Sequence, residues 1–317
     1  MDKRNAGTPL HLDWALDVRI NRSATLRRAQ TLGTRRSVKK EYQAAWLLKA
    51  ITMIDLTTLD GMDTPQRVAR LCAKAKQPVR QDILEALGMG EYGLTVGAVC
   101  VFPNRVRDAV AALHGTNIPV AAVSTGFPSG QMPVSSQLDE IEKMVEMGAR
   151  EIDIVISREH VHMGNWKALY DEIQAYRRAC GDTAHLKTII ETGELGTLTN
   201  VYRASMVCMM GGADFIKTST GKASVNATLP FGLVMCRAIR DYHVRTGFKV
   251  GFKPAGGISK AKDALNWLIL IKEELGDDWL TSEMFRFGAS SLLGDIERQL
   301  SHYVTGRYAS SKYMPVA

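Results

Sequence analysis

The sequence contains no apolar run as long as the roughly 18–20 residues that a membrane-spanning helix needs. Its first residues, MDKRNAGTPLHLDW, carry charge but no apolar stretch, so we expect no secretory signal. The five cysteines are odd in number and form no C-x-x-C motif, which disfavours both a disulfide framework and a structural zinc site. These absences predict a cytoplasmic protein with no membrane partner and with buried, reduced thiols.

Two further absences narrow the class of protein. No G-x-G-x-x-G motif follows the first predicted strand, which disfavours a dinucleotide-binding fold. No group of histidines or carboxylates has the spacing of metal ligands, so we expect neither a metal ion nor another cofactor. Hydrophobic residues make up 45% of the chain and charged residues 23%, values typical of a globular protein.

The net charge of +7 lies in the first 50 residues, which hold eleven Lys and Arg against four Asp and Glu. A basic arm of this kind can contact nucleic acid or another anionic surface. The core of the arm, RRAQTLGTRRSVKK (27–40), offers few aromatic side chains for stacking on bases, and no recognition motif accompanies it. We therefore interpret the arm as a solvated helix face and expect no nucleic-acid partner.

From about residue 45 the sequence alternates between short runs rich in Val, Ile and Ala and longer amphipathic stretches. Eight strands are predicted, each followed by a helix, over residues 51–57, 95–101, 119–125, 151–157, 185–191, 214–220, 250–256 and 284–290. This pattern predicts a (β/α)8 TIM barrel with an N-terminal helical extension. We expect a basic, partly helical extension over residues 1–44, the barrel over 45–305 and a C-terminal tail over 306–317.

Charged side chains are predicted to face the barrel interior, where branched apolar residues are the rule. Alternation along the strands turns Asp153, Lys187, Glu191 and Lys217 inward, while Asp55, Lys253 and Arg286 lie at or near the ends of other strands. Structural ion pairs, such as Asp153 with Lys187, are one explanation, because a buried charge is costly unless it is paired. We expect the group to converge at the C-terminal mouth, where the active sites of TIM barrels lie, and therefore favour a catalytic site.

The two inward lysines predict a specific chemistry. A lysine is a poor nucleophile at neutral pH because its ordinary pKa is about 10.4. Burial and a neighbouring cation both lower that pKa, so Lys217 beside Lys253 is suited to attack a carbonyl and form a Schiff base. Asp153 is the candidate for moving protons.

Glycine-rich segments follow the last three predicted strands. They are TSTGK (218–222), PAGGI (254–258) and FGASSLL (287–293). Their backbone N–H groups, together with a helix that starts behind Ser290 and Ser291, can bind an anion. Because phosphate sites of such barrels lie after the seventh and eighth strands, these segments and Lys222 predict a phosphorylated substrate.

Six segments carry a family resemblance: DLTTL (55–59), EIDIVI (151–156), KTIIETGEL (187–195), DFIKTSTGK (214–222), GFKPAGG (251–257) and RFGASSLL (286–293). They resemble, in order, the motifs of the deoxyribose-phosphate aldolase family. The N-terminal extension and STGFPSGQ (124–131) resemble the animal branch of that family. The resemblance implies a TIM barrel and a class I, metal-free aldolase. Such an enzyme reversibly cleaves 2-deoxy-D-ribose 5-phosphate to acetaldehyde and glyceraldehyde 3-phosphate, in deoxynucleoside catabolism.

The resemblance also implies residue roles. Lys217 matches the Schiff-base lysine, Lys253 the second lysine that tunes it, and Asp153 the proton-shuttling aspartate. The phosphate-binding segments contain Lys222, Gly256, Gly257, Ser290 and Ser291. We also count Asp55 and Lys187 among the substrate-binding residues.

Two alternatives stay open. One is another Schiff-base lyase on a barrel, such as a transaldolase. The other is a non-catalytic, nucleic-acid-associated protein that uses the basic arm. The expected partner is a small sugar phosphate, and both a monomer and a homo-oligomer remain open.

Overall fold

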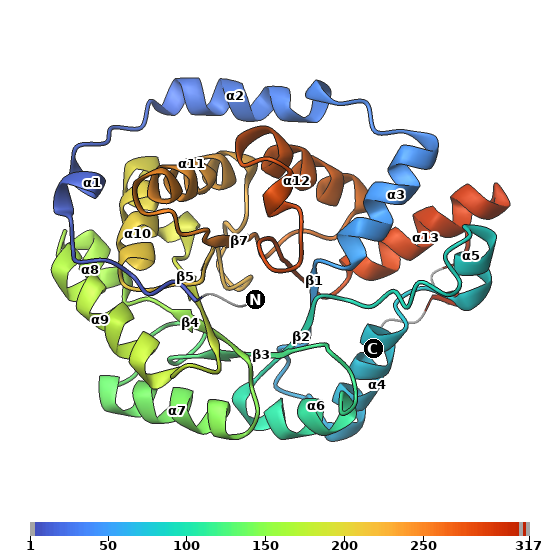
Figure 1. Ribbon diagram of the computed structural model, residues 1–317, viewed down its shortest axis with the longest axis horizontal. Coiled ribbons are helices and arrows are strands. Elements are labelled where there is room, and N and C mark those ends of the chain that lie inside the picture. Colours follow the sequence, from blue (N-terminus) through green and yellow to red (C-terminus); the bar gives the residue numbers. More distant parts are fainter. Residues whose placement is uncertain (1–3, 311–312, 315–317) are drawn as a thin grey trace.

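The barrel is the central feature of the computed structural model, which describes residues 4–310 and 313–314. Its strands are β1 (Ile54–Thr57), β2 (Ala98–Val101), β3 (Val120–Ser124), β4 (Glu151–Val155), β5 (His185–Ile189), β6 (Phe215–Lys217), β7 (Gly251–Lys253) and β8 (Phe287–Ala289). All seven pairings are parallel, in the order β7-β6-β5-β4-β3-β2-β1-β8. Two parallel bridges, Phe252 with Phe285 and Ala255 with Gly288, close the ring. The predicted TIM barrel is confirmed (Figure 1).

Helices surround the strands on all sides (Figure 1). After the N-terminal segment they are α4 (Pro65–Lys76), α5 (Gln81–Ala86), α6 (Val106–Ala112), α7 (Val134–Glu146), α8 (Arg158–His162), α9 (Trp166–Ala179), α10 (Leu198–Met210), α11 (Leu229–Thr246), α12 (Ala261–Glu274) and α13 (Leu292–Thr305). Outward strand side chains, such as Ile152, Ile154 and Ile216, are fully buried in the layer between strands and helices. This layer is the main hydrophobic core, so the polar side chains that alternate with it point to the barrel axis.

Each predicted strand is present, but every one is shorter than its apolar run. The first begins only at Ile54, because residues 51–53 complete the preceding helix and its turn. The last three strands have three residues each, and the remaining Gly, Ser and Thr residues of their runs form loops. These loops lie at the C-terminal end of the barrel, so the shortening frees backbone for a binding site.

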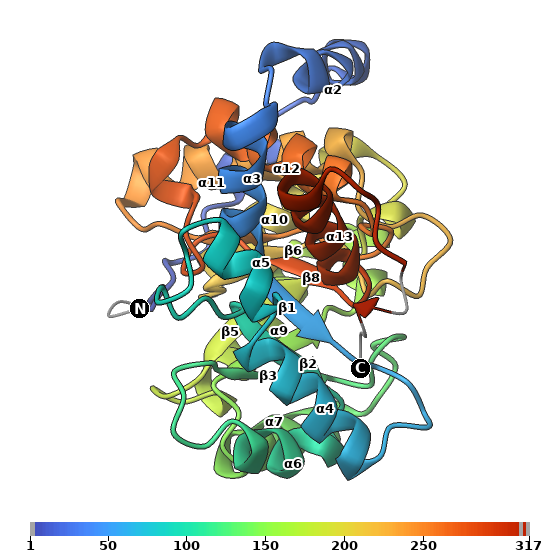
Figure 2. The ribbon, with the colours of Figure 1, turned by 90° about the vertical axis from the view of Figure 1, so that its right-hand side faces the viewer.

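The N-terminal segment folds along the outside of the barrel as α1 (Leu12–Leu16), α2 (Arg22–Arg35) and α3 (Lys40–Ile51). Helix α2 lies against α11 and α12 (Figures 1 and 2). Its inner face is buried, and ion pairs join Arg28 to Glu274 at 2.8 Å and Arg36 to Glu273 at 2.7 Å. The basic residues on its outer face remain exposed, which is the arrangement of a solvated helix face.

The start of the chain is anchored more firmly than a free arm would be. Asn5 is 3% exposed, and its side-chain amide donates to the carbonyls of Met209 and Ala213 at 2.7 and 2.9 Å. Helix α3 runs without a break across residues 44 and 45, where the extension was expected to meet the barrel. At the other end, α13 stops at Thr305, where the tail was expected to begin, and Gly306 caps it with φ 71°. Within the described residues, no helix combines the length and apolar character that crossing a bilayer requires.

Candidate active site

Lys217 is the last residue of β6, and its side chain points into the barrel because Ile216 packs outward against the helices. The residue is 3% exposed, and its Nζ donates to Oδ2 of Asp153 at 2.7 Å. Lys217 also lines a cavity of about 680 Å³ at the C-terminal end of the barrel. Its amine is therefore almost completely desolvated and yet lies at the wall of a space large enough for a sugar phosphate.

Lys253 lies beside Lys217 because the two residues are register partners in β7 and β6. Its Nζ donates to the same oxygen of Asp153, also at 2.7 Å, and to Asp55. Oδ2 of Asp153 thus accepts from both lysines. The structure brings together the three residues predicted to be catalytic, with the carboxylate between the two amines.

The electrostatic environment separates the two lysines. Burial lowers the pKa of Lys217; Asp153 opposes this, Lys253 reinforces it, and the net effect is a lowered pKa. Burial also disfavours the charged form of Lys253, but Asp153 and Asp55 outweigh it and raise the pKa of Lys253 above its ordinary value. Burial alone would raise the pKa of both aspartates, yet the surrounding cations lower it. Lys217 is therefore the lysine disposed to be neutral, while Lys253 stays protonated.

Below the two lysines, inward charges continue to the other end of the barrel. Lys187 donates to Asp55 at 3.0 Å and to Glu151. Arg286 donates to Asp55 at 2.6 Å and to Glu151 at 2.9 Å. The interior thus holds four cations and three carboxylates joined by ion pairs. A neutral Lys217 removes the excess positive charge, so the count of charges agrees with the lowered pKa of Lys217.

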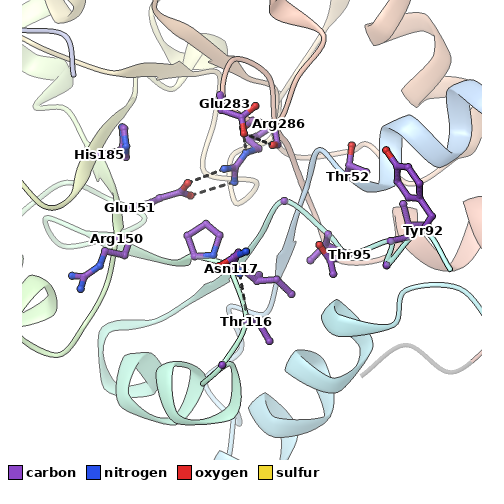
Figure 3. A pocket seen from close by; sticks show the side chains of 18 of the residues that line it. Thr52, Tyr92, Thr95, Thr116, Asn117, Arg150, Glu151, His185, Glu283 and Arg286 are labelled. Carbon is purple, nitrogen blue, oxygen red and sulfur yellow. Dashed lines mark hydrogen bonds and ion pairs between the residues drawn. The ribbon is translucent and has the colours of Figure 1, made fainter. Parts of the chain in front are cut away.

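The expectation that all the charged residues converge at the C-terminal mouth is wrong for Arg286. It precedes β8, so it lies at the N-terminal end, where it lines a second cavity of about 780 Å³ and pairs with Glu151 (Figure 3). Strand alternation predicts whether a side chain faces the barrel interior or the helices, but not its position along the barrel axis. Asp55 and Lys187 are fully buried and line neither cavity. Their place among the substrate-binding residues stays a prediction.

The residues predicted to bind phosphate surround one cavity. Lys222, Gly256, Gly257, Ser290 and Ser291 all line the cavity that Lys217 lines. Nζ of Lys222 donates to the carbonyl of Leu59 at 3.1 Å, which joins the loops after β6 and β1. Gly256 and Gly257 have φ 85° and 79°, a backbone conformation that favours glycine. Ser291 is the N-cap of α13, whose free N–H groups and helix dipole favour an anion.

Two charged residues near this cavity received no role from the sequence. Arg67 lines it from the first turn of α4, where it pairs with Asp60 at 3.2 Å and Asp63 at 3.4 Å. The signal available was Thr64-Pro65, a helix start that places Arg67 above the end of β1. Glu191 was expected inside the barrel, but β5 ends at Ile189 and Glu191 begins the next turn with φ 51°.

All five cysteines are free and buried, as the sequence predicted. Among residues 4–310 and 313–314, no three His, Cys, Asp or Glu side chains gather as a metal site would require. The cation-binding groups of the barrel are instead carboxylates already paired with lysine and arginine.

Comparisons with known proteins agree with this geometry. Residues 49–294 match the family model "DeoC/LacD family aldolase". The chain is 60% identical to the human deoxyribose-phosphate aldolase, with 100% of both chains covered, and 62% identical to the mouse protein, with 98% of both covered. A putative deoxyribose-phosphate aldolase structure from Toxoplasma gondii is similar with a TM-score of 0.71 at 21% identity, over 84% of this chain and 98% of that one. An Aeropyrum pernix deoxyribose phosphate aldolase structure, described as a unique tetramer, has a TM-score of 0.60 at 21% identity, over 89% of this chain and 99% of that one. At such identities the two structures support the fold alone, whereas the family match and the close relatives show that the chain belongs to the DeoC/LacD aldolase family.

Proposed function

We propose that this protein is a deoxyribose-phosphate aldolase of class I. It reversibly cleaves 2-deoxy-D-ribose 5-phosphate to acetaldehyde and D-glyceraldehyde 3-phosphate through a Schiff base on Lys217. The observation that carries the proposal is a desolvated lysine, paired with a shared aspartate, at the wall of a cavity whose other wall suits a phosphate. The printed names of the human and mouse relatives support the same substrate.

The first step needs a neutral amine. Because the pKa of Lys217 is lowered, a larger fraction of its amine is unprotonated at neutral pH than for a free lysine. Nζ attacks the C1 aldehyde of the open-chain sugar, and the resulting carbinolamine loses water to give an iminium. Protonated Lys253, 2.7 Å from Asp153, keeps a positive charge beside the reacting amine throughout.

The bond that breaks is C2–C3, since this cleavage separates two-carbon acetaldehyde from the three-carbon phosphate. The C3 hydroxyl gives up its proton, the C2–C3 electrons move into the iminium, and an enamine forms on Lys217. Asp153, held ionised by its lysine partners, accepts the hydroxyl proton and returns it to C2 of the enamine. Water then hydrolyses the iminium, which releases acetaldehyde and regenerates the amine.

The 5-phosphate is assigned to the loops that line the same cavity as Lys217. We assign it to Lys222, to the backbone at Gly256 and Gly257, and to Ser290 and Ser291 at the start of α13. A lysine and several N–H groups suit a dianion. Asp55 supports the reaction because its carboxylate favours the charged form of Lys253, and Lys187 donates to the same carboxylate.

The setting follows from the substrate. We propose a role in the breakdown of deoxynucleosides in the cytoplasm, with the sugar phosphate as the partner. We further propose that the chain forms a homo-oligomer, because the Aeropyrum pernix relative is described as a tetramer. Light scattering of the full chain tests this last point, and a monomeric mass would contradict it.

Borohydride trapping tests the chemistry. Reduction in the presence of acetaldehyde should leave an ethyl group on Lys217 and abolish cleavage of 2-deoxy-D-ribose 5-phosphate irreversibly. Peptide mass spectrometry locates the adduct, and borohydride without acetaldehyde is the control. An adduct on Lys253 would reassign the nucleophile, and a protein that neither forms an adduct nor cleaves the sugar would refute the proposal.

A further inference from the structure

Glu191 is a buried acid beside the active site that the proposed reaction does not use. It follows β5, is 1% exposed and has a left-handed backbone with φ 51°, which a glutamate rarely adopts. Its Oε2 accepts the backbone N–H of Thr220 at 3.1 Å. Thr220 lines the cavity of Lys217 and Lys222, so the carboxyl group is bonded directly to a loop of the site.

The contact continues to the predicted phosphate ligand. The hydroxyl of Thr220 accepts the backbone N–H of Lys222 at 3.1 Å. Glu191 thus fixes the amide of Thr220, and the side chain of Thr220 fixes the amide of Lys222. A backbone hydrogen bond joins the same two segments, because the N–H of Thr192 donates to the carbonyl of Thr218 at 2.9 Å. The whole 218–222 segment therefore rests on the turn that Glu191 begins.

Close packing leaves this turn little freedom to move. A Cβ on Gly193 would lie 2.1 Å from the carbonyl oxygen of Val225, so the turn and the 223–226 segment touch through backbone. On the far side of that segment, a Cβ on Gly256 would lie 2.6 Å from Cβ of Asn226. The turn after β5, the loop after β6 and the loop after β7 are therefore stacked. Because these segments are closely packed, we expect a substitution at Glu191 to shift the loops that line the cavity.

The carboxyl group is under-satisfied for an ionised acid. Its Oε1 has no hydrogen-bond partner among the described residues, and the nearby hydroxyls of Thr192 and Ser219 have none either. The nearest cation is Arg158, whose Nη1 is 3.9 Å from Oε2 and 3.1 Å from Glu194. Burial raises the pKa of Glu191, with Glu194 acting in the same direction, although the bond from Thr220 and the charge of Arg158 oppose it. The raised pKa disfavours a negative charge on Glu191 near the proposed phosphate site.

We infer that Glu191 is a positioning residue for phosphate recognition: its buried carboxyl group holds the 218–222 loop in the shape that presents Lys222 to the substrate phosphate. The inference rests on the proposed function for its substrate. The ordering of the 218–222 loop by Glu191 does not depend on the proposed function. Glu191 touches neither Lys217 nor the reacting carbons, so its effect should fall on substrate binding and not on the chemical step.

Three variants separate the possibilities. Glu191→Ala removes the acceptor for the Thr220 amide. Glu191→Gln keeps an acceptor oxygen of the same reach and cannot ionise. Glu194→Gln is the matched control, because Glu194 belongs to the same turn and pairs with the same Arg158 but makes no bond to the loop. Each variant is assayed with 2-deoxy-D-ribose 5-phosphate and with unphosphorylated deoxyribose, and amide hydrogen exchange is followed for a peptide covering residues 218–222.

Glu191→Ala should raise KM for the phosphorylated sugar about 5- to 10-fold, because one backbone hydrogen bond that orders the loop is lost. Its kcat, and its kcat/KM for deoxyribose, should change far less, and exchange of the 218–222 amides should accelerate. Glu191→Gln should restore the wild-type KM and exchange, and Glu194→Gln should match the wild type.

Three results overturn the inference. One is an equal loss on both sugars in Glu191→Ala. Another is unchanged exchange at 218–222 in that variant. The third is a Glu191→Gln variant as impaired as Glu191→Ala, which would mean that the charge and not the acceptor matters. If Glu191→Ala does not fold, Glu191→Asp, which is too short to reach the Thr220 amide, replaces it. A wild type that does not cleave the phosphorylated sugar refutes the proposed function, and the exchange measurement still decides the role of Glu191.

Discussion

The two ends of the barrel interior contain the same kinds of side chain but compensate them differently. At the N-terminal end, Arg286 and Lys187 each contact both Asp55 and Glu151 within 4 Å, and Lys187 also lies 3.7 Å from Asp153. At the C-terminal end, Lys217 has one partner, Asp153, and shares that carboxylate with Lys253. Lys253 also pairs with Asp55, so Lys217 alone among these four cations has a single carboxylate partner within 4 Å.

The difference supports the proposal that the reaction takes place at the C-terminal end. Glu151 and Asp55 outweigh burial and raise the pKa of Arg286, whereas burial and the nearby Lys253 lower the pKa of Lys217. The N-terminal pairs also hold Asp55 ionised, and Asp55 in turn keeps Lys253 charged. We therefore expect the N-terminal end to contribute stability and electrostatic support, and the C-terminal end to hold the proposed nucleophile.

Removing the nucleophile should have the largest effect. Lys217→Ala should lower kcat/KM for 2-deoxy-D-ribose 5-phosphate by a factor on the order of 10⁴, because no covalent intermediate can form. The fold should persist, since the change removes a poorly compensated buried amine. The measurement is a cleavage assay beside circular dichroism and thermal unfolding.

The same variant also tests the lowered pKa through stability. Because folding lowers the pKa of Lys217, the unfolded chain binds that proton more tightly, and wild-type stability should rise with pH toward the ordinary lysine pKa of about 10.4. Lys217→Ala should lose this part of the slope. Identical pH dependences of unfolding in the two proteins would mean that Lys217 is protonated in the resting enzyme.

Removing an ion pair at the N-terminal end of the barrel should lower the free energy of unfolding more than the catalytic rate. Arg286→Met should lower the free energy of unfolding by about 3–5 kcal/mol, because it leaves two buried carboxylates short of a partner. Activity of the folded protein should fall far less than in Lys217→Ala. Urea unfolding measures the first effect, and a loss below about 1 kcal/mol would show that the pairs at this end are no firmer than surface pairs.

Arg240→Met provides the control for Arg286→Met. Arg240 is half-exposed, and its ion pairs, with Asp241 and Glu274, are 3.8 and 3.9 Å long. Its loss should cost less than about 1 kcal/mol, as is usual for exposed pairs.

The sequence predicted which charged side chains face the barrel interior. It did not predict how far along the barrel axis each of them lies. Two-residue alternation correctly turned Asp153, Lys187 and Lys217 inward, because each directly follows a buried apolar residue of its strand that faces the helices, namely Ile152, Leu186 and Ile216. Height depends on register between strands far apart in sequence. Lys187 pairs with Asp153 and Phe215, whereas Lys217 pairs with Ile189, two residues further along β5. No local pattern encodes that offset.

The site loops show the same limit. Glycine and serine runs after β6, β7 and β8 indicated an anion site, since their composition is unusual for strands. The support from Glu191 was not visible, because it depends on where β5 ends and on a left-handed backbone at a residue that rarely adopts one. Arg67 was missed because seven residues separate β1 from its helix, and only the three-dimensional fold brings that helix to the cavity.

Removing Lys253 from Asp153 should make the pairing of Lys217 more like that of the cations at the N-terminal end. Lys253→Leu deletes the neighbouring cation, so the pKa of Lys217 should rise, and activity at neutral pH should fall by a factor of about 10². The pH dependence of imine formation with acetaldehyde should shift to alkaline pH. Lys249→Leu is the matched control, because Lys249 precedes the same strand and pairs at the surface with Asp278. Slower turnover with an unshifted profile would identify Lys253 as a proton carrier instead of an electrostatic tuner.

We expect the smallest effect from a change in the proposed phosphate site at the C-terminal end of the barrel. There the charge at issue is that of the substrate phosphate. Ser291→Asp places a carboxylate at the start of α13, in the cavity that Lys222 lines. It should lower the ratio of kcat/KM for the phosphorylated sugar to that for deoxyribose about 10-fold, because a negative charge there repels the phosphate and remote binding energy is used at the reacting centre. Ser291→Asn has nearly the same size without the charge and should change the ratio much less. An equal fall for both sugars in Ser291→Asp would locate the phosphate elsewhere in the cavity. The assignment of the glycine and serine loops to the phosphate would then be wrong.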